Sequence, residues 1–227
     1  MSEIPVIVIS SPQPQSGKTT LALNLAAALW SDGYHVNLFM PDNTVVDRFI
    51  SRRLEFCMHY KISLPASRSI TNISDVVVSP DSKEVIIADI PTAQNEKYAD
   101  IFSKAHTLIT IADKPSVMQW ELNDPYLNLI WQAKKNIAAR GVKYLNWIAV
   151  ANLKNEKDWR SSLDELSHRY GFRIAPPLKN RQAYRHIDEG YCAADMTGNS
   201  KIFKMSFEDV YARREILKLT DFLWQQK

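Results

Sequence analysis

The residues of this chain that could do chemistry are concentrated in its first twenty. A short apolar run, residues 6–9, leads into the turn SPQPQSGKTT, residues 11–20, which an apolar helix follows. The phosphate-binding pattern G-x-x-x-x-G-K-[ST] is matched at its end by Gly17, Lys18 and Thr19. Its first glycine is replaced by Pro12. Because the backbone N–H groups of such a loop and the positive end of the next helix attract a triphosphate, the sequence predicts an altered phosphate-binding loop.

The phosphate-facing half of this loop is intact. Proline lacks a backbone N–H, but Pro12 and Pro14 precede the donors that are expected to face phosphate. We expect Lys18 to contact the β and γ phosphates and the Thr19 hydroxyl to bind Mg²⁺. A G-K-T-T tetrapeptide alone is a weak signal, which the strand before it and the helix after it strengthen. The residues expected to bind the nucleotide are Gln15, Ser16, Gly17, Lys18, Thr19 and Thr20.

Length and composition favour one α/β domain, residues 1–227. Hydrophobic residues make up 45% of the chain, and no apolar run approaches the roughly 18–20 residues of a transmembrane helix. No basic segment precedes the first apolar run, so we expect no secretory signal and a cytoplasmic location. Cys57 and Cys192 are too few for a disulfide framework or a metal site. The net charge of +3 permits contact with nucleic acid or acidic lipid without demanding it.

The elements that must position the loop alternate between strands and helices. Uniformly apolar segments such as 84–89 and 107–112 favour a parallel sheet covered on both faces. The alternation predicts an α/β fold with a doubly wound, mostly parallel sheet and helices on both faces, as in P-loop NTPases. Residues 43–80 give no clear pattern. The other expected strands are 36–40, 147–151 and 172–174, and the expected helices are 18–30, 122–139, 159–170 and 210–224.

Polar residues stand at or just beyond the carboxyl ends of several expected strands, where ligands of such sheets bind. Asp89 follows four apolar residues, which is the pattern of a Walker B acid that holds Mg²⁺. Asp42 could orient or polarise the attacking water. Either aspartate could instead cap the next helix. The expected catalytic residues are Lys18, Asp42 and Asp89, the expected metal ligands are Thr19 and Asp89, and Asn152 lies at the same edge.

Several motifs resemble the ParA/MinD superfamily of deviant P-loop ATPases. They are GKTTLALNLAAAL, VNLFMPD and VIIADIPT. Later segments, among them NWIAVAN at 146–152, LDELSHRYGFRIA at 163–175 and RQAYR at 181–185, are most similar to the MipZ division-plane regulators. The resemblance implies an ATPase that uses ATP and Mg²⁺, dimerises around ATP and binds DNA nonspecifically as a dimer. It also implies contact with a ParB-type protein or with the tubulin-like division protein FtsZ, and a role in chromosome partitioning or division-site positioning.

The resemblance also assigns roles to single residues. It makes Lys18 the phosphate lysine, Thr19 the Mg²⁺ ligand and Asp89 the Walker B acid. It makes Asp42 the residue that places the hydrolytic water and Asn152 the amide that recognises adenine. Each assignment agrees with the role expected from the residue type and its place in the sheet.

The chain departs from this family's loop at several positions. The family has a second lysine four residues before Gly17, which reaches the phosphates across the dimer, and here that residue is Gln13. Pro14 and Gln15 replace two glycines, and Met40 replaces the first acid of a D-x-D pattern. Because Gln13 carries no charge, we expect weaker ATP-driven dimerisation. A positive φ at Gln15 would add strain of about 1 kcal/mol.

These departures leave other functions open. One alternative is a degenerate pseudo-ATPase that serves as a scaffold for DNA or protein. Another is a small-molecule enzyme, such as a P-loop synthetase or kinase, which would need a substrate pocket.

Two further surfaces could bind large partners. Arg181 and Arg185 would share one helical face if their segment is helical, with Lys179 nearby, and could contact DNA; the alternative is a solvated surface. The last helix places basic residues beside apolar ones, as in helices that lie on acidic membranes. Such a stripe is more often packed on its own domain, so we do not expect membrane binding.

Overall fold

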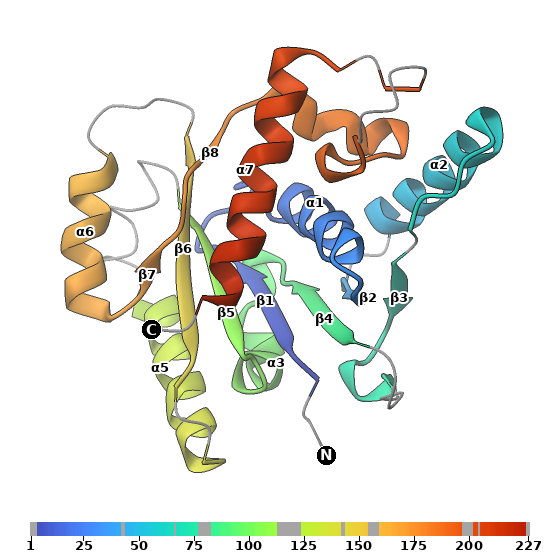
Figure 1. Cartoon of the computed structure of the whole chain (residues 1–227). Coiled ribbons are helices and arrows are strands. Elements are labelled where there is room, and N and C mark those ends of the chain that lie inside the picture. Colours follow the sequence, from blue (N-terminus) through green and yellow to red (C-terminus); the bar gives the residue numbers. More distant parts are fainter. Residues whose placement is uncertain are drawn as a thin grey trace.

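The computed structural model describes residues 4–41, 44–65, 67–76, 83–112, 124–141, 144–153, 159–196, 202–203 and 205–225. Its centre is a sheet in which all paired strands are parallel, in the order β3-β2-β4-β1-β5-β6-β7, with β8 also paired to β6 (Figure 1). The strands are β1 (Val6–Ser10), β2 (His35–Phe39), β3 (Arg68–Ile70), β4 (Glu84–Asp89), β5 (Thr107–Ala112), β6 (Asn146–Leu153), β7 (Arg173–Ile174) and β8 (Leu178–Lys179).

The central strand β1 shows why the sheet is covered on both faces. All five of its residues are buried, and the four apolar ones alternate between two apolar clusters. Val6 and Val8 belong to the cluster that includes helices α3 (Ala99–Ser103), α5 (Asp124–Ala139) and α6 (Trp159–Tyr170). Ile7 and Ile9 belong to the cluster that includes α1 (Lys18–Ser31) and α7 (Phe207–Trp224). Because successive side chains of a strand point to opposite faces, a strand with apolar residues on both faces requires helices on both sides.

In the described part of the chain, five long helices and a short one supply these two layers. They are α1 (Lys18–Ser31), α2 (Thr44–Tyr60), α3 (Ala99–Ser103), α5 (Asp124–Ala139), α6 (Trp159–Tyr170) and α7 (Phe207–Trp224). Short 3₁₀ turns connect them: η1 (Ile73–Asp75), η2 (Thr92–Gln94), η3 (Glu96–Tyr98), η4 (Gln182–Glu189) and η5 (Ala193–Asp195). The expected α/β fold is therefore confirmed, and the strands 84–89 and 107–112 and the helix 159–170 lie at the expected residues.

The segment that gave no clear pattern contains a long helix. Helix α2 extends from the sheet edge beside β2 and β3 (Figure 1), and its Arg53 is buried. The Arg53 guanidinium forms two hydrogen bonds of 2.7 Å with the carboxylate of Asp195 in η5. Gly190 approaches the backbone of α2 so closely that an added Cβ would lie 2.4 Å from Arg52. These contacts fix α2 to a segment far away in sequence.

Helix α7 packs on its own domain, as expected. Its buried residues Ile216, Leu219 and Leu223 belong to the cluster that also contains α1. Across the described ranges, no helix is both long and apolar enough to cross a membrane.

Candidate nucleotide-binding site

The loop between β1 and α1 is fixed to the sheet at its start. The Ser11 hydroxyl donates to the carbonyl of Ile111 in β5 at 3.0 Å and accepts the Gln13 N–H at 3.1 Å. Further along, Gln15 and Gly17 have φ values of 55° and 91°. The positive φ considered for Gln15 is thus present, in a residue that lacks glycine's freedom. Helix α1 then begins, with Gly17 as its N-cap.

Lys18 is held by one hydroxyl group. Its side chain is buried, and its Nζ donates to Oγ1 of Thr92 at 2.9 Å, which in turn donates to the Gln13 carbonyl at 2.9 Å. Burial lowers the pKa of the Lys18 ammonium because it disfavours the charged form, and the carboxyl of Asp89 opposes this shift. A phosphate bound at this position would place a negative charge beside Lys18 and so favour its charged form.

The pair Thr19 and Asp89 provides oxygen atoms of the kind that Mg²⁺ prefers. The Thr19 hydroxyl donates to Oδ2 of Asp89 at 2.5 Å. The other carboxylate oxygen, Oδ1, is buried and has no hydrogen-bond partner among the described residues, and the same holds for Oγ of Ser16. Burial raises the pKa of Asp89, whereas the hydrogen bond from Thr19 and the positive charge of Lys18 oppose this shift. A carboxylate, a hydroxyl and an unpartnered buried oxygen fit a bound Mg²⁺ ion.

Asn152 reaches the loop from the end of β6. Its Nδ2 donates to the carbonyl of Ser16 at 2.9 Å. A Cβ added at Gly17 would lie 3.2 Å from this same Nδ2, in a backbone conformation that side chains rarely adopt. The amide therefore supports the loop backbone and explains why position 17 needs glycine. Recognition of adenine by Asn152 stays a prediction.

The structure brings most of the expected site residues together. Lys18, Thr19, Asp89 and Asn152 converge at the carboxyl edge of the sheet through the contacts described above. Asp42 lies outside the described residues. Met40, at the position of the family's first acid, is buried in the apolar cluster beside α1, so no charge replaces the missing carboxylate there.

Sequence reasoning gave no role to Thr92, which joins Lys18 to the loop backbone. The signal that could have found it is its place as the first hydroxyl residue after Asp89 in the segment DIPT. It also missed Asn95, whose Oδ1 is buried without a described partner.

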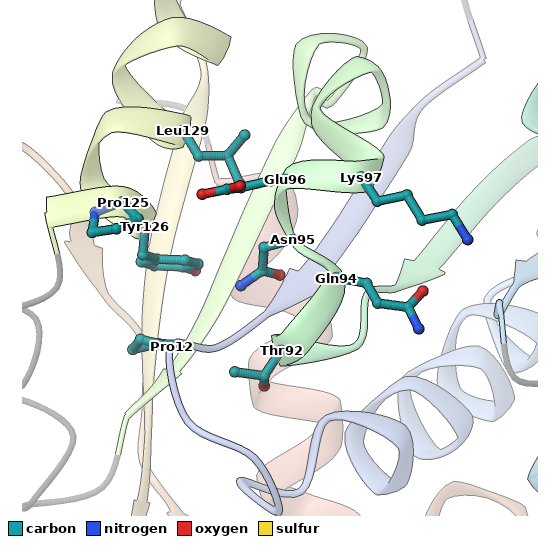
Figure 2. A pocket seen from close by; sticks show the side chains of 9 residues that line it. All are labelled: Pro12, Thr92, Gln94, Asn95, Glu96, Lys97, Pro125, Tyr126 and Leu129. Carbon is teal, nitrogen blue, oxygen red and sulfur yellow. The ribbon is translucent and has the colours of Figure 1, made fainter.

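A pocket of about 520 Å³ lies directly beside the loop, and both of these residues line it. Figure 2 shows the Asn95 side chain pointing toward Tyr126, with Pro12 of the loop below them. The volume of this pocket is in the range of small-molecule binding sites. The lining residues are Pro12, Thr92, Gln94, Asn95, Glu96, Lys97, Pro125, Tyr126 and Leu129.

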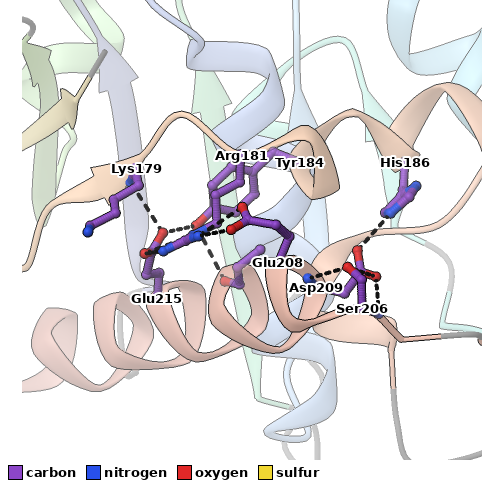
Figure 3. A network of polar contacts seen from close by, with 9 residues as sticks. Lys179, Arg181, Tyr184, His186, Ser206, Glu208, Asp209 and Glu215 are labelled. Atoms are coloured by element: carbon purple, nitrogen blue, oxygen red, sulfur yellow. Dashed lines mark hydrogen bonds and ion pairs between the residues drawn. The ribbon is translucent and has the colours of Figure 1, made fainter. Parts of the chain in front are cut away.

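The expected helical face with Arg181 and Arg185 does not form. Arg181 is the extended residue that precedes η4, and η4 is a 3₁₀ helix, so the two side chains have no i, i+4 relation. Arg181 faces α7, where it binds Glu215 at 2.7 Å and Glu208 at 2.9 Å (Figure 3). Its side chain is only 9% exposed. Arg185 is exposed.

The solved structures that resemble this chain share its fold. The MinC:MinD cell division protein complex of Aquifex aeolicus is 14% identical, with a TM-score of 0.58 over 98% of this chain and 96% of that one. An ATP complex of a Cyanothece McdA variant is 15% identical, with a TM-score of 0.60 over 100% and 99%. MinD of Pyrococcus horikoshii OT3 complexed with Mg-ADP is 12% identical, with a TM-score of 0.58 over 97% and 96%.

The family itself is identified from sequence. No curated protein matches the chain. The model of the family ATPase MipZ matches residues 81–224, which is more than half of the chain and begins after the phosphate-binding loop. The chain therefore belongs to the MipZ family of ATPases.

Proposed function

We propose that this protein is a nucleotide-dependent switch whose domain, residues 1–227, binds Mg-ATP at the loop between β1 and α1. One observation carries the proposal. Lys18, Thr19 and Asp89 meet at one edge of the sheet, and Asp89 retains a buried oxygen without a described partner. Mg²⁺ held by Thr19 and Asp89 would neutralise phosphate charge, while Lys18 and the N–H groups of residues 15–20 bind the phosphates.

The contact between Lys18 and Thr92 offers a way to report nucleotide. The Lys18 ammonium has three N–H donors and gives one to the Thr92 hydroxyl at 2.9 Å, so a phosphate that draws Lys18 toward itself would lengthen this contact. When Lys18 turns to phosphate, the support that Thr92 gives to the Gln13 carbonyl changes as well. Asp42, which follows the carboxyl end of β2 in the sequence, would then place the hydrolytic water. Slow hydrolysis would reset the switch.

The protein's assembly follows from the same loop. The family implies an ATP-dependent homodimer that acts in chromosome partitioning or division-site positioning in the cytoplasm or on the nucleoid. Nonspecific DNA, a ParB-type protein and an FtsZ-type protein are the proposed partners. Gln13 brings no positive charge to the dimer, so association should be weaker than with a lysine there. Arg185 remains a candidate DNA contact because it is exposed, whereas Arg181 is bound to glutamates.

The first experiment is calorimetry with Mg-ATP on the wild type and on Lys18→Ala. We expect micromolar binding that the substitution abolishes. A wild type that does not bind at millimolar nucleotide, or a variant that binds equally well, would refute nucleotide binding and favour the pseudo-ATPase scaffold. Phosphate release by Asp42→Ala, in a sample shown to bind ATP, then tests the role of Asp42; an unchanged rate removes that role.

The second experiment is a solution mass measurement with and without Mg-ATP on the wild type, Gln13→Lys and Gln132→Lys. The last variant adds the same charge at an exposed position of α5 and is the control. We expect nucleotide to favour the dimer more strongly in Gln13→Lys than in either of the other proteins. Equal association of all three would show that the missing cation does not limit dimerisation.

The pocket beside the loop supports a second candidate, a small-molecule ATP-dependent enzyme. It contains the buried Asn95 amide and lies next to Thr92, so an acceptor bound there would stand beside the phosphates. Product analysis of Mg-ATP incubated with candidate acceptors separates the two functions. A phosphorylated or ligated product that Asn95→Ala no longer forms would establish the enzyme, and release of phosphate to water alone would exclude it.

A further inference from the structure

A second pocket lies at the opposite end of the sheet from the phosphate-binding loop, where β6 and β7 begin, near the lower end of α5 in Figure 1. Its volume is about 510 Å³. Among the described residues that line it there is no carboxylate, but there are two positive side chains. The lining residues are Lys134, Ala138, Tyr144, Leu145, Asn146, Trp147, Gly171 and Arg173.

The two positive side chains are bonded only to neutral acceptors within the described part of the chain. Lys134 donates to the carbonyl of Tyr170 at 3.1 Å. Arg173 donates to Oδ1 of Asn146 at 3.0 Å and to the carbonyl of Phe222 at 3.2 Å. These contacts use one donor of the ammonium and two of the guanidinium, which have three and five. Burial lowers the pKa of both groups, with no carboxylate to oppose it.

Aromatic rings surround these charges. The Lys134 ammonium lies 4.5 Å from the ring centroid of Trp131 and 4.8 Å from that of Trp147. Trp147 is buried, whereas Tyr144 in the lining is 49% exposed, and Trp131, which contacts Lys134 from the same helix, is 44% exposed. Large exposed aromatic groups beside an arginine are the residue types that dominate the energetics of protein interfaces.

We propose that this pocket binds a short segment of a partner protein in which a carboxylate side chain stands beside an aromatic one. The carboxylate binds between Lys134 and Arg173, whose remaining donors can form charge-assisted hydrogen bonds with it. The neighbouring aromatic side chain packs against the exposed ring of Tyr144. Charge complementarity favours an acidic segment because the described lining of the pocket holds two cations and no carboxylate. The proposal does not depend on nucleotide binding.

The test titrates the ¹⁵N-labelled full-length chain with three capped dipeptides and follows the tryptophan indole N–H signals by NMR. The peptides are acetyl-Phe-Glu-amide, acetyl-Phe-Gln-amide and acetyl-Ala-Glu-amide. We expect the first to shift the signals of Trp131 and Trp147 and to bind about fivefold more tightly than either of the others, because only it supplies both charge and ring.

Two variants and a matched control locate the binding site. Lys134→Met retains the apolar stem against the tryptophans and removes the charge, and it should weaken the first peptide about tenfold. Arg173→Lys retains a charge but removes the planar fork, and it tests the same pocket should Lys134→Met fail to fold. Lys135→Met removes an exposed charge from the next position of α5 and should change nothing.

Other outcomes would overturn the proposal. Equal affinity of the Glu and Gln peptides would show that no carboxylate is recognised. An equal loss in Lys135→Met would show general electrostatic attraction. A self-association without peptide that Lys134→Met abolishes would identify a second copy of the chain as the occupant. If a short DNA duplex displaces the peptide and shifts the same indole signals more strongly, the occupant of the pocket is nucleic acid.

Discussion

Lys18 and Arg181 are both positive side chains with little exposure, but their partners differ. Lys18 donates a hydrogen bond to the Thr92 hydroxyl, and the carboxyl of Asp89 acts on it electrostatically without a described ion pair. Arg181 is bound by Glu208 and Glu215 and lies 5.1 Å from the Tyr211 ring. A cation whose hydrogen bond goes to a neutral group is available to an anionic ligand, whereas a cation bonded to two carboxylates stabilises the fold. Residue type and position in the sequence do not distinguish the two.

The largest expected effect is on Lys18. Lys18→Met should lower the affinity for Mg-ATP at least about 100-fold, which corresponds to about 2.7 kcal/mol, because a charge-assisted phosphate contact is lost. The free energy of unfolding without nucleotide should not fall, since burial disfavours the Lys18 charge. Calorimetry and urea unfolding measure the two quantities. A large loss of stability with unchanged affinity for Mg-ATP would show that Lys18 stabilises the fold and does not bind the nucleotide.

Arg181 should behave in the opposite way. Arg181→Met removes the cation beside Glu215, to which the Tyr184 hydroxyl and the Lys179 backbone N–H still donate, and should lower the free energy of unfolding by about 2 kcal/mol because Glu215 is little exposed. The affinity for Mg-ATP should not change. Urea unfolding of Arg185→Met, which removes an exposed charge four residues away, is the control and should show about 0.5 kcal/mol or less. DNA binding that Arg181→Met abolishes in a stable protein would contradict this division.

Asp209 is another charged residue that stabilises the fold, and its contribution to the free energy of unfolding should depend on pH. Burial disfavours its charge, but hydrogen bonds from Ser206 and His186 outweigh burial and lower its pKa below 3.8. A lowered pKa in the folded state stabilises the protein above the unfolded value, and this stabilisation is lost as the pH falls through the folded value. Asp209→Asn should therefore cost about 1 kcal/mol at pH 7, and the difference should shrink below about pH 4. Urea unfolding at both pH values measures it; a pH-independent difference would show a loss of packing only.

The smallest expected effect is on Gln15. Its φ of 55° strains a residue with a side chain, and Gln15→Gly should relieve about 1 kcal/mol, partly offset by the greater freedom of glycine in the unfolded state. We expect a slight gain in stability and tighter Mg-ATP binding. Gln15→Ala, which retains the strain, is the control for thermal unfolding and calorimetry. Equal behaviour of the two variants would show that the strain at position 15 has no consequence for the loop.

Much of the fold could be predicted from the sequence because the buried strands have strong local patterns. β4 and β5 are almost wholly buried and mainly apolar, and α6 has a regular amphipathic period, so their bounds agree with the expectation. The α2 region could not be predicted in the same way. Its buried side includes Arg53, which from sequence alone would be placed on the surface. Its partner, Asp195, lies 142 residues later in the chain.

The candidate site was predicted to a similar extent, and for a similar reason. Lys18, Thr19 and Asp89 follow local motifs, and the parallel sheet brings their positions together. Thr92 ends the segment VIIADIPT, but nothing in that segment indicates its contact with Lys18, which appears only in three dimensions. The partners of Arg181 lie in α7, more than twenty residues away, so its structural role could not be seen from the spacing of basic residues.

The central place of β1 has a consequence for how the protein is made. Its neighbours come late in the chain, since Val6 pairs with Ile86 and Ile7 with Thr107. At about 5–20 residues per second, a ribosome needs roughly 5–20 s to add the hundred or so residues that separate β1 from β5. During that time the apolar residues of β1 have no sheet to join and are exposed to chaperones and to other nascent chains. The loop that would bind nucleotide is thus synthesised well before Ile111 and Asn152, the residues of β5 and β6 that hold it.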